Sequence, residues 1–156
     1  MESPQLSSLY QQLILEHYRN PRNKAELDEK TVEIHMANPV CGDEIRLQLR
    51  IEGDHIAEAK FVGSGCSISQ AAVSMMTTRL QGANLVEADA LAKRFTEMMH
   101  GDETAAKDKT LGDLRALEGV SKFPVRIKCA LLGFDALQEA LKKEVGEVGG
   151  VGGDLN

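Results

Sequence analysis

Cysteines are few, positive charge is in the minority and long apolar runs are missing from this 156-residue sequence. Eighteen lysines and arginines face 24 aspartates and glutamates, which argues against a general nucleic-acid binder because such proteins need surplus cations to displace phosphate counterions. No apolar run approaches the roughly 18 residues that span a bilayer, and the N-terminus lacks the basic start and apolar stretch of a secretory signal. These absences predict a soluble, cytoplasmic protein that binds neither nucleic acid nor a membrane.

The sequence has three cysteines, at positions 41, 66 and 129. A small, odd number of cysteines does not make a disulfide framework. In a reducing compartment such cysteines pack in the core, bind a metal or act as reactive thiols. The apolar share of 42% and charged share of 27% are those of an ordinary globular chain. At this length we expect a single domain over residues 1–145. Five glycines among the last eleven residues predict a flexible tail over residues 146–156.

Hydrophobic spacing predicts one helix followed by three strands. Apolar residues recur at helical spacing over residues 5–20, and Pro21 ends that run because the residue before a proline is pushed out of helical geometry. Alternating apolar and polar residues then predict strands over residues 32–36, 45–51 and 55–62. Their short connections favour an antiparallel meander with one buried face.

The rest of the chain returns to helical spacing. Asn84 is a suitable helix cap and Pro124 a suitable first-turn residue. The predicted helices cover residues 66–80, 84–100, 111–117 and 121–144, with a polar loop over residues 101–109. Strands first and helices after predict an α+β fold, in which helices pack on a three-stranded antiparallel sheet.

Cys41, Gly42 and Asp43 are the first candidate site. If the middle strand continues back to Cys41, the side chains of Cys41 and Asp43 point the same way, roughly 6.5–7 Å apart at the backbone and close enough to reach one ion. Gly42 lets the backbone bend between them. For this tripeptide alone, a strand-entry turn with a packed cysteine and a capping aspartate is the simpler interpretation.

Cys66 and Cys129 are the other two candidates. Cys66 follows a Gly-Ser-Gly segment and opens a predicted helix, where unpaired N–H groups favour a thiolate over a thiol. Cys129 lies in the second turn of the last helix, and Arg126 on the same face could offset a cluster of anionic ligands. Each cysteine alone is also explained as a small buried hydrophobe.

Together, Cys41, Asp43, Cys66 and Cys129 form a plausible four-coordinate zinc set of three thiolates and one carboxylate. Their separations along the chain match no CxxC finger, so spacing adds little. The histidines fit such a site less well. We expect solvent-facing side chains for His35, His55 and His100, and a packed or hydrogen-bonded one for His17.

Four motifs give the sequence a resemblance to the iron–sulfur assembly proteins related to IscU. They are HYRNPRN at residues 17–23, NPVCGD at 38–43, GSGCSIS at 63–69 and GVSKFPVRIKCA at 119–130. The last motif resembles the SufU branch, and the match runs from about Leu9 to Leu141. IscU-type scaffolds place a histidine where this chain has Lys128, and they carry a Leu-Pro-Pro-Val-Lys motif that it lacks. These differences favour sulfur carriage over cluster building.

The resemblance implies a zinc ion held by Cys41, Asp43, Cys66 and Cys129, with Arg126 beside the metal. It also implies a partner, a pyridoxal-phosphate cysteine desulfurase of the SufS type, which makes a persulfide from cysteine. The sulfur would then pass to Suf cluster-assembly proteins downstream. In SufU-like proteins a histidine of the desulfurase takes the place of one ligand on the metal.

The function expected from residues and resemblance is a zinc-dependent sulfur carrier. A four-coordinate zinc site is closed, so one ligand must leave before its thiolate can react. Cys41, near a turn, is the expected ligand, while Arg126 and the helix start at Cys66 offset the negative charge of the site. A scaffold carrying iron or an iron–sulfur cluster is the alternative. A purely structural zinc domain and a thiol oxidoreductase remain as further alternatives, although no CxxC supports the latter.

Overall fold

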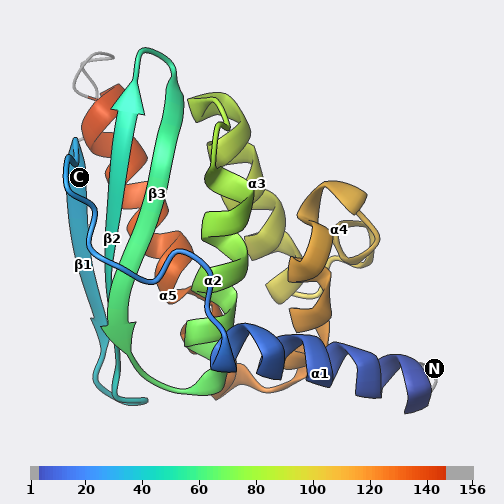
Figure 1. The fold of residues 1–156 in the computed structure, drawn as a ribbon. Coiled ribbons are helices and arrows are strands. Elements are labelled where there is room, and N and C mark those ends of the chain that lie inside the picture. Colours follow the sequence, from blue (N-terminus) through green and yellow to red (C-terminus); the bar gives the residue numbers. More distant parts are fainter. Residues whose placement is uncertain (1–3, 147–156) are drawn as a thin grey trace.

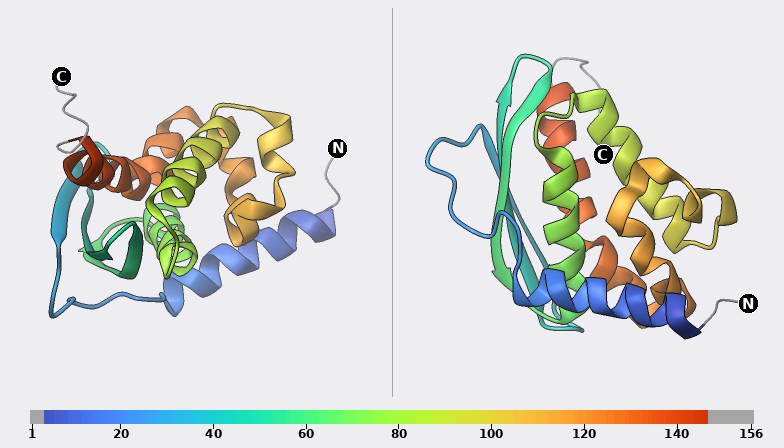
Figure 2. Two further views of the ribbon diagram at one scale, coloured as in Figure 1. Left: turned by 90° about the horizontal axis from the view of Figure 1, so that it is seen from above. Right: turned by 45° about the vertical axis from the view of Figure 1, so that its right-hand side comes forward.

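The structure is a computed structural model that describes residues 4–146, and it has the predicted α+β architecture. Three strands form one sheet, and the helices stack against one of its faces in two layers (Figures 1 and 2). In chain order the elements are α1 (Pro4–Arg19), β1 (Val32–Asn38), β2 (Asp43–Glu52), β3 (His55–Ser64), α2 (Ser67–Leu80), α3 (Leu85–Met99), α4 (Glu103–Ala106), the 3₁₀ segment η1 (Lys109–Lys122), α5 (Pro124–Leu141) and the π-helical turn η2 (Lys142–Gly146).

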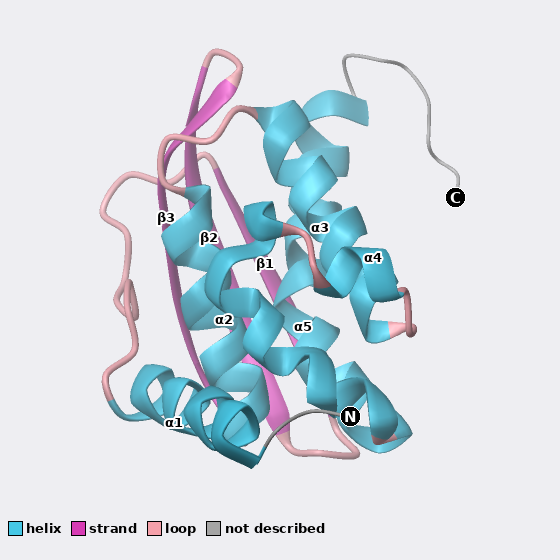
Figure 3. Cartoon of the chain, turned by 90° about the vertical axis from the view of Figure 1, so that its right-hand side faces the viewer, coloured by secondary structure: helices cyan, strands magenta, loops and turns pink. Residues whose placement is uncertain are grey.

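The sheet is an antiparallel meander in the order β1-β2-β3. Leu47 at the middle of β2 pairs with Ile34 on one side and with Phe61 on the other. All three side chains are buried, because strand alternation places them on the face that α2 and α5 cover. Figure 3 shows these helices in front of the sheet. The predicted strands and their buried face are confirmed.

The segment between α1 and β1 covers part of the opposite face of the sheet. It first runs beside the free edge of β3, where the Phe61 N–H donates to the Asn23 carbonyl at 3.0 Å. It then crosses β2, where the Leu27 N–H donates to Oε1 of Gln48 at 2.6 Å. Gln48 is therefore fully buried although it alternates with the core leucines of β2.

Two layers of helix complete the core. The first consists of α2 and α5, and the second contains α3, α4 and η1 (Figure 2). The rings of Phe95 in α3 and Phe134 in α5 stack between the layers, with centroids 4.3 Å apart. The predicted cap of α3 is present, since Asn84 and Glu87 form a reciprocal capping box.

Two local predictions were wrong. Residues 101–109 are not wholly a loop, because the Asp102 side chain accepts hydrogen bonds from the N–H groups of Thr104 and Ala105 and so starts α4. The short helix predicted over residues 111–117 is a longer 3₁₀ segment, interrupted at Gly112, whose φ is 56°. The tail predicted over residues 146–156 lies outside the described residues except for Gly146. None of the helices within residues 4–146 has the length and apolar character to cross a membrane.

Candidate metal centre

Three connections that are remote in sequence meet at one end of the sheet. They are the turn between β1 and β2, the link from β3 to α2, and the start of α5, all at the lower end of the molecule in Figure 1. Each connection carries one of the three cysteines: Cys41, Cys66 and Cys129. The meander and the packing of α2 and α5 therefore bring the three thiols to the same region.

Asn38 builds the turn that presents Cys41. Its carbonyl accepts hydrogen bonds from the N–H groups of Cys41, at 3.2 Å, and of Gly42, at 2.9 Å. Its side chain accepts from the Val40 N–H and donates to Cys41 Sγ at 3.5 Å. The strand does not continue back to Cys41. These bonds and the positive φ of Gly42, 73°, close a strand-entry turn, and β2 begins at Asp43.

Asp43 is the buried centre of the site, with 1% of its surface exposed. Its Oδ1 accepts a hydrogen bond of 2.8 Å from the Cys66 backbone N–H, and its Oδ2 lies 3.8 Å from Cys66 Sγ. This approach requires a glycine at position 65, since a Cβ there would collide with Asp43 Oδ1 and lie 2.9 Å from Ser69 Oγ. Gly65 thus leaves the space that the Asp43 carboxylate at the start of β2 occupies.

Cys66 is the N-cap of α2, as predicted. Its Sγ accepts a hydrogen bond of 3.5 Å from the Ser69 N–H in the first turn of the helix. The first turn of the helix thus supplies this sulfur with a backbone hydrogen-bond donor.

Cys129 is the most deeply buried of the three thiols, with 1% exposed. Its Sγ donates to Cys41 Sγ across a distance of 2.8 Å. Burial raises the pKa of the Cys129 thiol well above its ordinary value, and hydrogen bonds to Cys41 and Asp43 raise it further.

The resulting donor set fits a metal ion. One donor atom each from Cys41, Asp43 and Cys129 lie within 4.8 Å of one another, and this group could hold an ion. Cys66 is not in that group but adjoins it through Asp43. Two or three sulfurs with one carboxylate suit zinc, and a bound cation would favour the deprotonated form of its cysteine ligands. Cys41, Asp43 and Cys129 are thus brought together as expected, and Cys66 lies beside them.

The other predicted residues lie outside this group. Arg126 is exposed in the first turn of α5 and forms no hydrogen bond or ion pair with any side chain that the structure describes. His17 is buried and bonded through Nδ1 to Ser74 Oγ at 2.8 Å, as expected. His35 and His100 are exposed.

Asn38 and Ser69 are site residues that sequence reasoning missed. Both are buried. The side-chain amide of Asn38 donates to Cys41 Sγ, and the backbone N–H of Ser69 donates to Cys66 Sγ. The asparagine three residues before Cys41 was an available signal. The Ser69 bond comes from the backbone at the third position after a helix cap, so the signal for it was the helix start at Cys66.

A groove of about 280 Å³ opens beside Cys41. Its lining consists of Asn38, Val40, Cys41, Pro124, Val125 and Lys128. Apolar side chains stand at this groove with unusual exposure: Val40 is 84% exposed and Val125 is 63% exposed. Cys41 is the only one of the three cysteines in this lining, so it is the thiol that this groove presents; Cys66 is also half-buried but does not line it.

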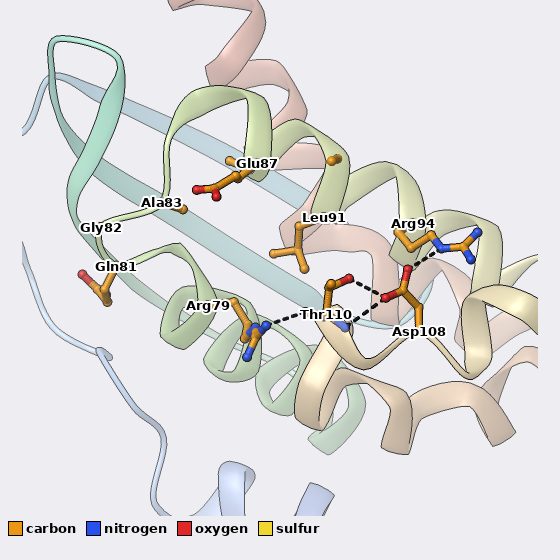
Figure 4. Close-up of a pocket in the computed structure, with 11 residues that line it drawn as sticks. Arg79, Gln81, Gly82, Ala83, Glu87, Leu91, Arg94, Asp108 and Thr110 are labelled. Carbon is orange, nitrogen blue, oxygen red and sulfur yellow. Dashed lines mark hydrogen bonds and ion pairs between the residues drawn. The ribbon is translucent and has the colours of Figure 1, made fainter.

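A larger groove of about 560 Å³ lies away from the cysteines, between the end of α2, α3 and the start of η1 (Figure 4). Its charged groups already have partners. Arg94 pairs with Asp108 at 2.7 Å, and Arg79 donates to the Thr110 carbonyl. This groove contains no cysteine or histidine, so its size does not make it the reactive site.

Comparison with known proteins agrees with the geometry. Residues 9–130 match the NifU-like N-terminal domain. The zinc-dependent sulfurtransferase SufU of Bacillus subtilis is 49% identical over 90% of this chain and 95% of its own. The iron–sulfur cluster assembly scaffold protein IscU of Streptococcus pyogenes is 41% identical over 92% of this chain and 89% of its own.

A solved structure gives the same result for the fold. The crystal structure of a candidate iron–sulfur cluster assembly scaffold protein for the SUF system from Fervidobacterium islandicum superposes with a TM-score of 0.76. It is 32% identical and covers 83% of this chain and 94% of its own. The resemblance deduced from the four cysteine- and asparagine-containing motifs is thereby confirmed, and the chain belongs to the NifU-like N-terminal domain family, with relatives of both the SufU and the IscU type.

Proposed function

We propose that this chain is a zinc-dependent sulfur carrier. It takes persulfide sulfur from a pyridoxal-phosphate cysteine desulfurase of the SufS type and passes it to Suf proteins that assemble iron–sulfur clusters. The observation that carries the proposal is the convergence of Cys41, Asp43 and Cys129, with Cys66 adjoining, beside a groove that exposes only Cys41. The relative named as a zinc-dependent sulfurtransferase supports the same conclusion.

Zinc would be held by Cys41, Asp43, Cys66 and Cys129, and when bound it keeps cysteine ligands deprotonated at neutral pH. The chain's own residues orient these ligands. Asn38 fixes the turn of Cys41, while the Cys66 N–H fixes the Asp43 carboxylate. Zinc-bound protein needs reduced thiols, which fits a cytoplasmic location.

Cys41 is the sulfur acceptor. Its thiolate attacks the terminal sulfur of the partner's persulfide, a new S–S bond forms on Cys41, and the partner's cysteine leaves as a thiolate. Cys41 is suited to this step because it lies in a turn and lines the groove, whereas Cys129 is buried and Cys66 caps a helix. Cys41 therefore has the freest path away from the other ligands.

Arg126 assists the same step. It lies one helical turn before Cys129, and its exposed guanidinium is free to meet the charge of the transferred sulfur once the partner has docked. Replacing Arg126 by alanine should slow transfer while leaving bound zinc unchanged, and lysine should restore part of the rate. Zinc loss in Arg126→Ala would assign the arginine to the stability of the metal site instead.

The desulfurase docks over the groove at Cys41. The exposed side chains of Val40, Phe123 and Val125 are apolar, and apolar groups of this exposure at a reactive thiol indicate a surface that a partner covers. Val125→Asp should weaken binding to the desulfurase by at least about tenfold. Val86→Asp is the matched control, since this valine on α3 is also highly exposed, at 78%, and lies away from the thiols.

The decisive experiment adds the purified protein to a SufS-type desulfurase and measures alanine production. Wild-type protein should stimulate turnover, and Cys41→Ala should abolish both the stimulation and the gain of one sulfur atom seen by mass spectrometry. Full stimulation by Cys41→Ala would remove Cys41 from the acceptor role.

Cluster assembly on this chain is a second candidate function, because a relative at 41% identity is a scaffold and Cys41, Asp43 and Cys129, with Cys66 adjoining, could ligate iron. Reconstitution with iron and sulfide should then give a visible chromophore that survives desalting and transfers to an apo-acceptor. A protein that keeps zinc and gains no stable chromophore would exclude this role.

A further inference from the structure

The sulfurs of Cys41 and Cys129 are close together, and the proposed transfer of sulfur does not require this contact. Their sulfurs are 2.8 Å apart, although 88 residues separate them along the chain. This distance lies between an S–S bond of about 2.05 Å and an ordinary non-bonded contact. Cys66 is not part of the same group of donor atoms. The thiol that accepts sulfur therefore has a second thiol at attacking distance, which is the arrangement of an acceptor cysteine and a resolving cysteine.

We propose that, in the metal-free protein, Cys129 attacks a persulfide on Cys41 and releases its outer sulfur as hydrosulfide, leaving a Cys41–Cys129 disulfide. This inference rests on the proposed loading of Cys41 with sulfur, but it does not depend on which donor loads it. It assigns the chain a second activity, the reduction of sulfane sulfur to sulfide.

The step balances without an external oxidant or reductant. The electron pair of Cys129 Sγ forms a bond to Cys41 Sγ, and the bond between Cys41 Sγ and the outer sulfur breaks. The outer sulfur leaves with that bonding pair and takes the proton that the Cys129 thiol loses. It is thereby reduced to hydrosulfide, while the two cysteines are oxidised to the disulfide. A dithiol reductant of the thioredoxin class is needed to reset the pair.

Position rather than acidity makes Cys129 the candidate resolving thiol. Burial raises the pKa of its thiol, so the neighbouring Asp43 carboxylate must take the proton as the attack begins. The Cys129 side chain is enclosed, and its sulfur lies 2.8 Å from that of Cys41. Small thiols in solution meet Cys41 from the groove instead. Metal ligation engages the electron pair of Cys129 that the attack requires. Occupancy of the metal site therefore decides whether sulfur on Cys41 is kept for transfer or released as sulfide.

The test uses the full chain freed of metal by a chelator and loaded with inorganic polysulfide, followed by anaerobic desalting. The loaded mass should decay to a mass two hydrogen atoms below that of the reduced protein, and one equivalent of hydrosulfide should appear. Peptide mapping should find Cys41 joined to Cys129. The rate should not depend on protein concentration, since both thiols belong to one molecule. Zinc added before loading should slow the release by at least about tenfold.

Two variants separate the thiols. Cys129→Ser should hold its persulfide at least about tenfold longer, whereas Cys66→Ser should still release hydrosulfide. Release at the wild-type rate from Cys129→Ser, or a disulfide that contains Cys66, would overturn the proposal. Circular dichroism checks that the variants fold, and if Cys129→Ser does not, the disulfide map of the wild-type chain decides the question. Because polysulfide is the donor, a failure here is distinct from a failure to stimulate the desulfurase.

Discussion

Substitution of Gly65 tests how the metal ligands are positioned. Gly65 is not a ligand itself, but its lack of a side chain lets the Asp43 carboxylate approach the Cys66 N–H. An alanine at position 65 would place its Cβ against Asp43 Oδ1 and 3.0 Å from the Asp43 Cα. The backbone there has a φ of 154°, which side chains rarely adopt. Gly65→Ala therefore strains the link from β3 to α2 and pushes the carboxylate away from the Cys66 N–H.

The expected magnitudes follow from these contacts. Strain at such a φ costs about 1–3 kcal/mol of unfolding free energy. Displacing Asp43 from the Cys66 N–H should also weaken zinc binding by about 10–100-fold, the usual cost of disturbing the groups that orient a metal ligand. The assays are urea unfolding of the metal-free protein and zinc competition with a chromophoric chelator.

Gly82 provides the matched control. Its φ is 78°, also in the region that favours glycine, but a Cβ there would meet nothing within 4 Å. Gly82→Ala should therefore cost about 1–2 kcal/mol of stability and leave zinc affinity unchanged. If Gly65→Ala lost only as much stability as Gly82→Ala and bound zinc like wild type, the close approach of Asp43 would play no part in ligation.

Three further predictions concern stability. Zinc at one hundred times its Kd should raise the unfolding free energy by about 2.7 kcal/mol, and Cys129→Ala should remove this gain, as thermal unfolding with and without zinc would show. Burial lowers the pKa of His17 from 6.5, so the unfolded chain binds more protons below that pH. The unfolding free energy of the metal-free protein should thus be undiminished by His17 above pH 6.5, and it should decrease as the pH falls from 6.5 through the lowered pKa. Urea titrations at several pH values should show a weaker pH dependence for His17→Asn. Asn84→Ala should cost about 1 kcal/mol through loss of the capping box and leave zinc affinity unchanged; a change in affinity would show unexpected coupling between α3 and the metal site.

The sheet and most helix ends could be predicted because each depends on local pattern. Ile45, Leu47 and Leu49 alternate with polar residues, so strand geometry alone places them on one buried face. Asn84 and Pro124 mark helix starts by their own hydrogen-bonding and backbone properties. The helix α4 was missed although Asp102 carries a cap signal, because four residues are too few for hydrophobic periodicity to register.

The candidate site was predictable in its residue types but not in its arrangement. Cys41 lies beside Asp43 and Cys66 begins a helix, which suggested that both could be metal ligands. The family resemblance then implied that they bind the same ion together with Cys129. The 2.8 Å contact between Cys41 and Cys129 depends instead on how α5 packs against the sheet, which no local pattern specifies. The turn built by Asn38 was missed for a similar reason, since its side chain and carbonyl act together only once β1 and β2 are paired.

X-ray absorption at the zinc edge of the purified, zinc-loaded protein tests the central claim most directly. The account predicts one zinc per chain, with three sulfur neighbours at about 2.3 Å and one oxygen neighbour at about 2.0–2.2 Å, and with one sulfur lost in Cys41→Ala. A zinc shell made of nitrogen and oxygen alone, or a shell that Cys41→Ala leaves unchanged, would contradict it.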